Sequence, residues 1–380
     1  MASSLENDLD AELLRRALEL AERGRGRVSP NPLVGAVIVR DGELLGEGHH
    51  AELGGVHAEV AALADCRERG HEPGGATMHV TLEPCAHRGR QPPCTEAILA
   101  AGVARVVIGA DDPTPKASGR GPQILRDEGV DVRWAAGPEA GAARLQNQAF
   151  RKHARTGRPR VVLKSALSLD GYTATRSGDS RWISGAESRA LVHRWRAEAD
   201  AVAVGIGTAL ADDPLLTARD VAAVGAGAPR QPLRMVFDSS ARLAPDSQLV
   251  RTAREVAVLV VVDAQAAPAE RTAALREAGV EVLETSGDRV ERLRAALDEI
   301  GRREVTSLLL EGGAELAGAF LDAREVDELG LFLAPVMLGS GRPLAARAGV
   351  EGVAEAERAL AIDWERCGPD LLARARLKEW

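Results

Sequence analysis

The sequence predicts a soluble α/β protein made of two consecutive domains. The chain has 380 residues, of which 45% are hydrophobic and 27% are charged, and this composition is typical of globular proteins. At about 100–200 residues per domain, such a length suggests two domains. Predicted helices and strands alternate along both halves of the chain, and this alternation favours layered α/β folds.

In the first half, the alternation begins close to the N-terminus. Apolar residues at helical spacing predict a helix over 8–23. The Asp41-Gly42 pair is a strong hairpin signal between two predicted strands. The strands of this half are predicted at 33–39, 44–48, 77–82 and 103–108, and its other helices at 56–69 and 95–101.

A basic stretch, RKHARTGRPR at 151–160, separates the two halves. It contains five arginine or lysine residues and no acidic residue, which indicates a solvated connector between domains, with a phosphate-binding patch as the alternative. We therefore predict domains at 1–152 and 153–380. In the second, strands are predicted at 161–163, 201–204, 233–237, 256–262, 280–283 and 307–310, with helices at 186–197 and 290–300.

Composition excludes several classes of protein. The longest apolar run, 256–262, has seven residues, whereas about 18 are needed to span a membrane. The net charge of −8 and the isoelectric point near 5.6 argue against a nucleic-acid or membrane-surface binder. Four cysteines do not make a disulfide framework, and the N-terminus lacks signal-peptide order. We expect a cytoplasmic protein with neither nucleic acid nor membrane as a partner.

Three residues offer the donors that zinc prefers, namely His57, Cys85 and Cys94. Catalytic zinc sites use three protein ligands and leave the fourth tetrahedral position to water. Glu59 lies two residues after His57, near a predicted helix start, where its carboxylate can move protons between water and a leaving amine without binding the ion. The pattern predicts one catalytic zinc ion per chain.

A closed structural zinc site is the alternative, with Cys66 or His87 as a fourth ligand. The order His-x-Glu and then Pro-Cys is, however, the signature of zinc deaminases. In that signature the second cysteine normally comes three positions after the first, and here it comes nine positions after it. The inserted residues, 86–93, are basic, which favours an anionic substrate.

These motifs resemble the deaminase half of the RibD-type bifunctional deaminase/reductases of riboflavin biosynthesis. The resemblance implies zinc ligation by His57, Cys85 and Cys94, with Glu59 as the proton donor. It also implies a cytidine-deaminase-like three-layer α/β/α domain. The matching segments are Asn31-Pro32-Leu33-Val34-Gly35, His57-Ala58-Glu59, Thr81-Leu82-Glu83-Pro84-Cys85, Gly89-Arg90-x-Pro92-Pro93-Cys94 and Gly109-Ala110-Asp111-Asp112-Pro113.

The second half resembles the reductase half of the same family, so the resemblance covers nearly the whole chain. It implies a dihydrofolate-reductase-like α/β domain that uses NADPH. A glycine pair, Gly312-Gly313, follows a predicted strand and begins a helix, where backbone N–H groups can approach a phosphate. The other matching segments begin at Lys164, Ser177, Thr208, Asp238 and Val326.

Carried over residue by residue, the resemblance implies two sets of contacts in this half. An arginine can hold a phosphate with two hydrogen bonds, which makes Arg219 the expected substrate anchor. Arg242 is a hypothetical contact for the 2′-phosphate of NADPH, and Lys164 either lies near the substrate or only flanks a strand. The implied substrate contacts are Ser180, Leu216, Arg219 and Glu311. The implied cofactor contacts are Leu167, Trp182, Thr208, Asp212, Ser239, Gly313, Ala314, Glu315, Leu316, Ala317, Gly318 and Ala319.

The predicted function is a two-step conversion of a pyrimidine ribotide. Water replaces an amine at C2 of a diaminopyrimidinone ribotide, and NADPH then reduces the ribosyl group at C1 to an open-chain ribityl group. Two other hypotheses stay open, a nucleic-acid-editing deaminase and a zinc-stabilised regulator without chemistry. The low aromatic content of 3% opposes the first, and Glu59 opposes the second. A homodimer or higher homo-oligomer is the expected assembly.

Overall fold

The computed structural model describes residues 2–88, 91–221, 230–347 and 349–380. Its contacts divide the chain into two units. The first runs to Thr156 and includes Trp380, and the second comprises Gly157–Glu379. Along the described part of the chain, no helix combines the length and the apolar character that crossing a membrane requires.

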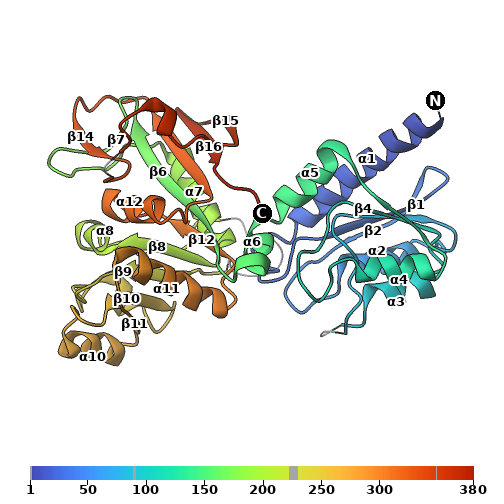
Figure 1. Ribbon diagram of the computed structural model, residues 1–380, viewed down its shortest axis with the longest axis horizontal. Coiled ribbons are helices and arrows are strands. Elements are labelled where there is room, and N and C mark those ends of the chain that lie inside the picture. Colours follow the sequence, from blue (N-terminus) through green and yellow to red (C-terminus); the bar gives the residue numbers. More distant parts are fainter. Residues whose placement is uncertain (1, 89–90, 222–229, 348) are drawn as a thin grey trace. The chain divides into compact units, whose positions relative to one another are not determined.

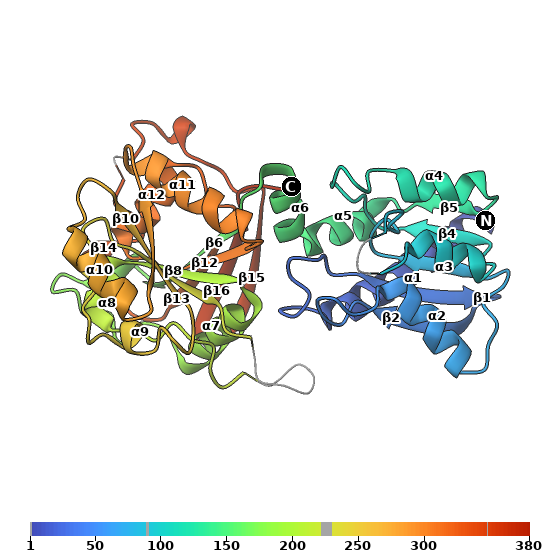
Figure 2. The same cartoon turned by 90° about the horizontal axis from the view of Figure 1, so that it is seen from below.

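The first unit is a five-stranded sheet between two layers of helices (Figures 1 and 2). The strand order is β2-β1-β3-β4-β5, and β1 is antiparallel to both of its neighbours. The strands are β1 Gly35–Arg40, β2 Glu43–His49, β3 Thr77–Val80, β4 Arg105–Ile108 and β5 Asp131–Trp134. The helices are α1 Ala2–Glu22, α2 Ala58–Glu68, α3 Cys94–Ala100, α4 Arg120–Asp127, α5 Gly137–Gln146 and α6 Gln148–Thr156.

Strand β1 shows why this sheet needs helices on both faces. Successive side chains of a strand point to opposite faces. Ala36 and Ile38 pack into the cluster that α2, α3 and α4 cover, whereas Val37 and Val39 pack against α1. All four residues are buried. A strand buried on both faces reads as a continuous apolar run, as this one does.

Gly35, the first residue of β1, lets α1 approach the sheet. A Cβ atom added there would lie 1.9 Å from the carbonyl oxygen of Ala17 in α1. Gly35→Ala is therefore expected to push α1 outward and to lower the free energy of unfolding of the first unit by about 1–3 kcal/mol. Chemical denaturation measures this. Gly141→Ala in α5 is the matched control, because a Cβ atom added there would have no neighbouring atom within 4 Å. An equal loss of unfolding free energy in this control would contradict the prediction.

The second unit is built on a nine-stranded sheet in the order β11-β10-β9-β8-β12-β6-β13-β16-β15, with a small β14-β7 pair beside it. Its strands are β6 Arg160–Ser168, β7 Tyr172–Thr175, β8 Ala201–Gly205, β9 Leu233–Phe237, β10 Val258–Asp263, β11 Glu281–Thr285, β12 Ser307–Leu310, β13 Glu328–Ala334, β14 Gly341–Pro343, β15 Ala361–Cys367 and β16 Asp370–Arg376. Its helices are α7 Ala186–Glu198, α8 Ile206–Asp212, α9 Gln248–Arg251, α10 Ala269–Glu277, α11 Arg289–Arg302 and α12 Ala314–Asp322, with a 3₁₀ turn at Val353–Glu355.

Two hydrophobic clusters cover the faces of this sheet. The long apolar run forms β10, where Leu259 and Val261 face the cluster of α11 and α12. Val258, Val260 and Val262 face the opposite cluster, which α8, α9 and α10 supply. The run therefore belongs to the core. From β11 to β13 the neighbouring strands are parallel, whereas β16 is antiparallel to both of its neighbours, β13 and β15.

The segment 151–160 contains the boundary between the two units, as predicted, but its first residues are not a solvated connector. The segment Gln148–Thr156 is helix α6, and Arg151 and Lys152 are only 2% and 1% exposed. Arg151 donates to the backbone carbonyl of Trp380 at 2.7 Å and to Asp111, and the Lys152 ammonium lies 5.4 Å from the centre of the Trp380 ring. Long basic side chains can be buried in this way when carbonyls, carboxylates and aromatic faces meet their charged ends.

Candidate active sites

The first site gathers the three predicted zinc ligands from separate parts of the first unit. His57 immediately precedes α2, Cys94 is the first residue of α3, and Cys85 lies in the loop after β3. Nδ1 of His57 lies 3.2 Å from Sγ of Cys94 and 3.6 Å from Sγ of Cys85. All three donor atoms lie within 4.8 Å of one another.

The spacing of these donor atoms is close to that of a zinc site. Tetrahedral zinc holds nitrogen at about 2.0 Å and sulfur at about 2.3 Å, which places the ligand atoms about 3.5–3.8 Å apart. The backbone N–H of Cys94 donates to Sγ of Cys85 at 3.4 Å, as outer hydrogen bonds do in metal sites. Hydrogen bonds from Cys94 and His57 lower the pKa of Cys85 to about 4, which favours the thiolate that zinc requires.

Glu59 lies in the first turn of α2, beside these ligands, and is 3% exposed. Burial raises the pKa of its carboxyl group to about 7. A carboxyl group with a pKa near neutrality can both accept and donate a proton at physiological pH, which suits general acid–base catalysis.

The two residues that would close the site lie elsewhere. Cys66 is buried in the core on α2, with its Sγ 3.6 Å from the carbonyl oxygen of His71. His87 is exposed. Among the described residues, the cluster that could hold a metal comprises His57, Cys85 and Cys94 alone, which matches a catalytic zinc site with one open position. Gly89 and Arg90 of the predicted motif lie outside the described residues.

The second site lies where the strand order of the large sheet reverses. Strand β12 lies between β8, which leads toward β11, and β6, which leads toward β15. Open α/β sheets bind ligands at the carboxyl ends of strands at such points. Glu311 follows β12 directly, and its backbone N–H donates to the carbonyl of Ala203 in β8 at 2.9 Å. On the other side of β12, Leu310 pairs with Leu163 of β6, the residue before Lys164.

Glu311 forms a largely buried ion pair with Arg196 of α7, and their side chains are 9% and 13% exposed, respectively. Nε of Arg196 lies 2.6 Å from one carboxylate oxygen and Nη2 lies 2.9 Å from the other. Burial acts to raise the pKa of Glu311, but the charge and hydrogen bonds of Arg196 outweigh it and hold that pKa below its usual value. Burial also lowers the pKa of Lys164, which is close enough to Glu311 to interact with its charge. Lys164 therefore faces the site.

Two of the predicted cofactor segments lie side by side. A Cβ added to Gly313, at the start of α12, would lie 3.3 Å from Oγ1 of Thr208 in α8. Two glycine-bordered helix starts thus meet, an arrangement that lets backbone N–H groups approach a dinucleotide phosphate. Leu316, by contrast, is buried with the three residues after it, so its side chain packs in the core.

The remaining predicted contacts fall into an exposed and a buried group. Trp182 is 71% exposed, with the Arg189 guanidinium 4.7 Å from its ring centre. Asp212 accepts a hydrogen bond at its backbone carbonyl from Arg181 at 2.8 Å. The other residues that reach the surface at least in part are Ser180, Arg219 and Ser239, and the buried ones are Leu167 and Leu216.

Comparison with known proteins decides the family. The model of the cytidine and deoxycytidylate deaminase zinc-binding region matches residues 7–110, and the model of the RibD C-terminal domain matches residues 159–373. Riboflavin biosynthesis protein RibD of Escherichia coli (strain K12) is 40% identical over 370 residues, which cover 95% of this chain and 98% of that protein. The chain belongs to the RibD family.

RibD proteins match along the whole length of the chain. RibD of Actinobacillus pleuropneumoniae is 38% identical over 98% of this chain and 96% of its own. The solved structure of Acinetobacter baumannii RibD, form 2, has a TM-score of 0.84 at 36% identity and covers 98% of this chain and 100% of that chain. The Thermotoga maritima deaminase/reductase has a TM-score of 0.84 at 32% identity, with the same coverage. The predicted fold class is confirmed.

As a member of the RibD family, the chain is a bifunctional enzyme of riboflavin biosynthesis. It combines a zinc-dependent deaminase, which is a hydrolase, with an NADPH-dependent reductase, which is an oxidoreductase. The two other hypotheses, an editing deaminase with an inert second domain and a regulator without chemistry, are therefore wrong.

Arg196 and His193 are the site residues that sequence reasoning missed. Both lie on α7, a helix that the sequence predicts, and both turn toward the segment that carries Arg219. An arginine within a helix usually indicates a solvated face, so its type gave no signal. Arg196 lies one helical turn after Val192, an apolar residue that is buried, and residues four apart share one face of a helix. This spacing is the one feature of the sequence that indicates the buried position of Arg196.

Proposed function

We propose that residues 1–152 carry the hydrolytic deamination and residues 153–380 the reduction. The substrate would be 2,5-diamino-6-(5-phospho-ribosylamino)pyrimidin-4(3H)-one, and the final product 5-amino-6-(5-phospho-ribitylamino)uracil. The observation that carries the assignment is the convergence of His57, Cys85 and Cys94 beside the buried Glu59. The related Thermotoga maritima protein is named for the same two activities, which supports the assignment.

In the deaminase half, zinc held by His57, Cys85 and Cys94 would supply Lewis-acid activation of water. Glu59 accepts the proton that the attacking water loses and delivers it to the amine, which leaves C2 as ammonia. Its burial keeps solvent from competing for that proton, and its pKa of about 7 allows both transfers at neutral pH.

In the reductase half, NADPH would supply a hydride to C1 of the ribosyl group. The starts of α8 and α12, at Thr208 and Gly313, hold the dinucleotide through backbone N–H groups. Arg219 is exposed and binds the substrate phosphate, while Glu311, which Arg196 orients, lies toward the ribosyl group. Leu216 is 2% exposed, so any contact it makes with the substrate uses its backbone.

Ammonia release tests the assignment. Purified protein is mixed with the diaminopyrimidinone ribotide, with and without NADPH, and ammonia and product mass are followed. We expect ammonia without NADPH and a reduced product after NADPH is added. Ammonia without reduction would contradict the reductase half, and zinc-replete protein that releases no ammonia would contradict the deaminase half.

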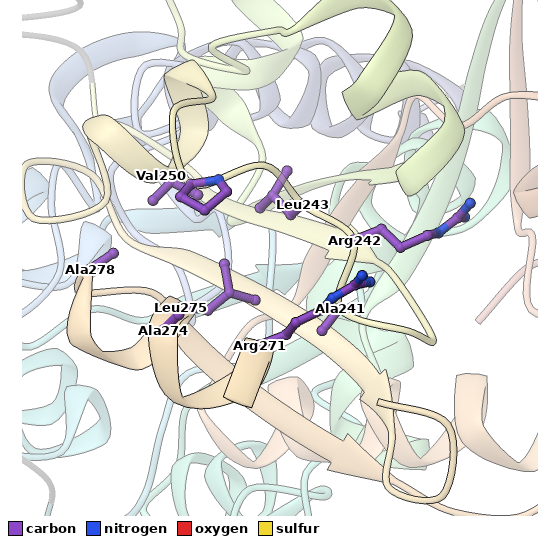
Figure 3. Close-up of a pocket in the computed structure, with 9 residues that line it drawn as sticks. Ala241, Arg242, Leu243, Val250, Arg271, Ala274, Leu275 and Ala278 are labelled. Atoms are coloured by element: carbon purple, nitrogen blue, oxygen red, sulfur yellow. The ribbon is translucent and has the colours of Figure 1, made fainter. Parts of the chain in front are cut away.

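Arg242 is proposed to bind the 2′-phosphate, the group that distinguishes NADPH from NADH. It borders a cavity of about 440 Å³ with an apolar lining that includes Leu243, Val250 and Leu275. Arg271 of α10 borders the same cavity, and the two side chains extend to the same side of it (Figure 3). Two guanidinium groups at one side of a cavity suit the 2′-phosphate of NADPH, and the predicted cofactor contact Ser239 precedes Arg242 by three residues.

Arg242→Ala is therefore expected to raise the KM for NADPH by about tenfold and to leave the KM for NADH nearly unchanged, since a lost charge-assisted hydrogen bond costs about 1.5–3 kcal/mol. Steady-state reductase kinetics with both cofactors measure this. Arg251→Ala on α9 is the control, because it removes an exposed arginine from the same region. Equal losses with both cofactors would contradict the role.

A homodimer in the cytoplasm is the proposed state of the enzyme. Strand β15 is an edge strand of the large sheet, and its Ile362 and Trp364 are 48% and 57% exposed, which supports association of two copies at that edge. Light scattering of the full chain tests the assembly, and a monomer at micromolar concentration would contradict it.

A further inference from the structure

The segment 213–219 follows α8 and contains Leu216 and Arg219, two residues of the proposed substrate site. It has neither helix nor strand structure of its own. Leu216 adopts a positive φ of 54°, a conformation that persists in residues other than glycine only where the surroundings enforce it. The surroundings of this segment are side chains from α7, β9, α9 and the residues before β9, which bind its backbone.

Gln231 binds the backbone next to Arg219. Its side-chain oxygen accepts from the N–H of Ala218 at 2.9 Å, and its side-chain nitrogen donates to the carbonyl of the same residue at 3.0 Å. One amide thus satisfies both polar groups of Ala218, as a neighbouring strand would. Ala218 is buried, whereas Arg219 is exposed, so the pair fixes the point where the chain turns outward.

Arg234 of β9 binds the same segment on the other side of Leu216. It is 0% exposed and donates to the carbonyl of Leu215 at 3.1 Å. Its other hydrogen bonds go to the hydroxyl and carbonyl of Thr252 and to the carbonyl of Val256. A buried guanidinium that binds carbonyls from two chain segments holds those segments at a fixed separation.

Residues of helices α7 and α9 also contact the segment 213–219. Nδ1 of His193 lies 3.2 Å from the carbonyl oxygen of Thr217 and 3.3 Å from the backbone nitrogen of Arg219. The backbone N–H of Gln248 in α9 donates to the carboxylate of Asp213 at 2.8 Å, and the side chain of Gln248 donates to the carbonyl of Asp213. Backbone groups are thus bound from one end of the segment to the other. The guanidinium of Arg219, by contrast, forms no hydrogen bond or ion pair with any residue that the structure describes.

We infer that Gln231 is a positioning residue of the reductase, which, together with Arg234, fixes the backbone of 215–219 so that Arg219 points at the substrate phosphate. This inference rests on the proposed role of Arg219. Binding is tighter when the anchor is held in place beforehand, because less conformational freedom is lost when the ligand binds. Gln231 acts through Arg219 and touches neither the ribotide nor NADPH.

Gln231→Met in the full chain tests the inference, because methionine keeps the length of the side chain and removes both hydrogen bonds. The reductase reaction is measured with the deaminated ribotide and NADPH. We expect the KM for the ribotide to rise about tenfold, while the KM for NADPH and the rate of deamination change less than twofold. Gln265→Met, on the exposed turn before α10, is the matched control and should change none of these values.

A double-mutant cycle separates positioning from general loosening of the fold. If Gln231 acts through Arg219, then Gln231→Met adds nothing to the KM of Arg219→Ala. The inference would be overturned if the ribotide KM of the double variant rose by the product of the two single-variant effects. It would also be overturned if Gln231→Met raised the KM for NADPH as much as the KM for the ribotide. Gln231→Asn, which keeps the amide but is one methylene too short to reach both groups, should raise the ribotide KM as well.

The same cycle distinguishes the positioning role from the phosphate anchor. A ribotide KM that is raised by Arg219→Ala but unaffected by Gln231→Met overturns the positioning role alone. A ribotide KM unaffected by Arg219→Ala overturns the phosphate anchor assigned under the proposed function and the positioning role with it.

Discussion

Glu59→Gln is expected to lower the rate of ammonia release by about 10²–10⁴-fold, the usual contribution of a general acid–base group. Glutamine has the same shape as glutamate but cannot accept and return a proton. Because Glu59 lies beside the zinc ligands and is not one of them, the zinc content should stay at one ion per chain. Reduction of the deaminated ribotide with NADPH should continue at the rate of the unmodified enzyme.

Glu68→Gln on the exposed face of α2 is the matched control for this substitution. Metal analysis and ammonia release are measured on the same samples. Loss of zinc together with activity would mean that Glu59 supports the metal site and would contradict its role in proton transfer.

Arg196→Met is expected to destabilise the second unit by about 3–5 kcal/mol at neutral pH and to abolish reduction. The reason is that the substitution leaves the buried carboxylate of Glu311 without its partner. In the unmodified protein the pKa of Glu311 lies below its usual value, so the pair stabilises the fold above the unfolded pKa, and this contribution is lost as pH falls through the folded pKa. The difference between variant and parent should therefore shrink in acid.

Urea unfolding followed by hydrogen exchange of second-unit peptides measures this difference. Arg194→Met, two residues earlier on α7 and exposed, is the control. An equal loss of stability in both variants, or a difference that grows as pH falls, would contradict the explanation through Glu311.

The sequence predicts those parts of the fold that local patterns determine. Strand β12 falls at the predicted 307–310, and most of the other predicted strands and helices agree with the structure to within two residues. The exceptions are α1, which begins six residues before the predicted helix, and β6, which extends five residues beyond the predicted strand. No helix or strand is predicted from the sequence over 109–150, yet these residues form α4, β5 and α5. These elements depend on packing rather than pattern, since β5 buries only one of its four residues.

The residues of the candidate sites likewise include some that the sequence predicts and others that only the fold reveals. His57, Cys85 and Cys94 were predictable because zinc chemistry restricts the residue types and their spacing. Arg196 and Gln231 were not, because an arginine and a glutamine are ordinary surface residues until the fold places them against Glu311 and Ala218. The burial of Arg151 and Lys152 escaped prediction for the same reason, since their partners are Asp111 and Trp380.

The strand order of the large sheet has a consequence for how the chain folds as it is synthesised. Strand β6 is the first of its unit to leave the ribosome, but its neighbours β12 and β13 are among the last. Its pairing therefore waits for distant chain, and such high contact order slows folding. In the first unit, β1 and β2 pair through a short hairpin. We expect the sheet of the deaminase unit to form while the reductase unit is still incomplete, and helix α6 to gain its contacts with Trp380 only later, once that residue has been synthesised.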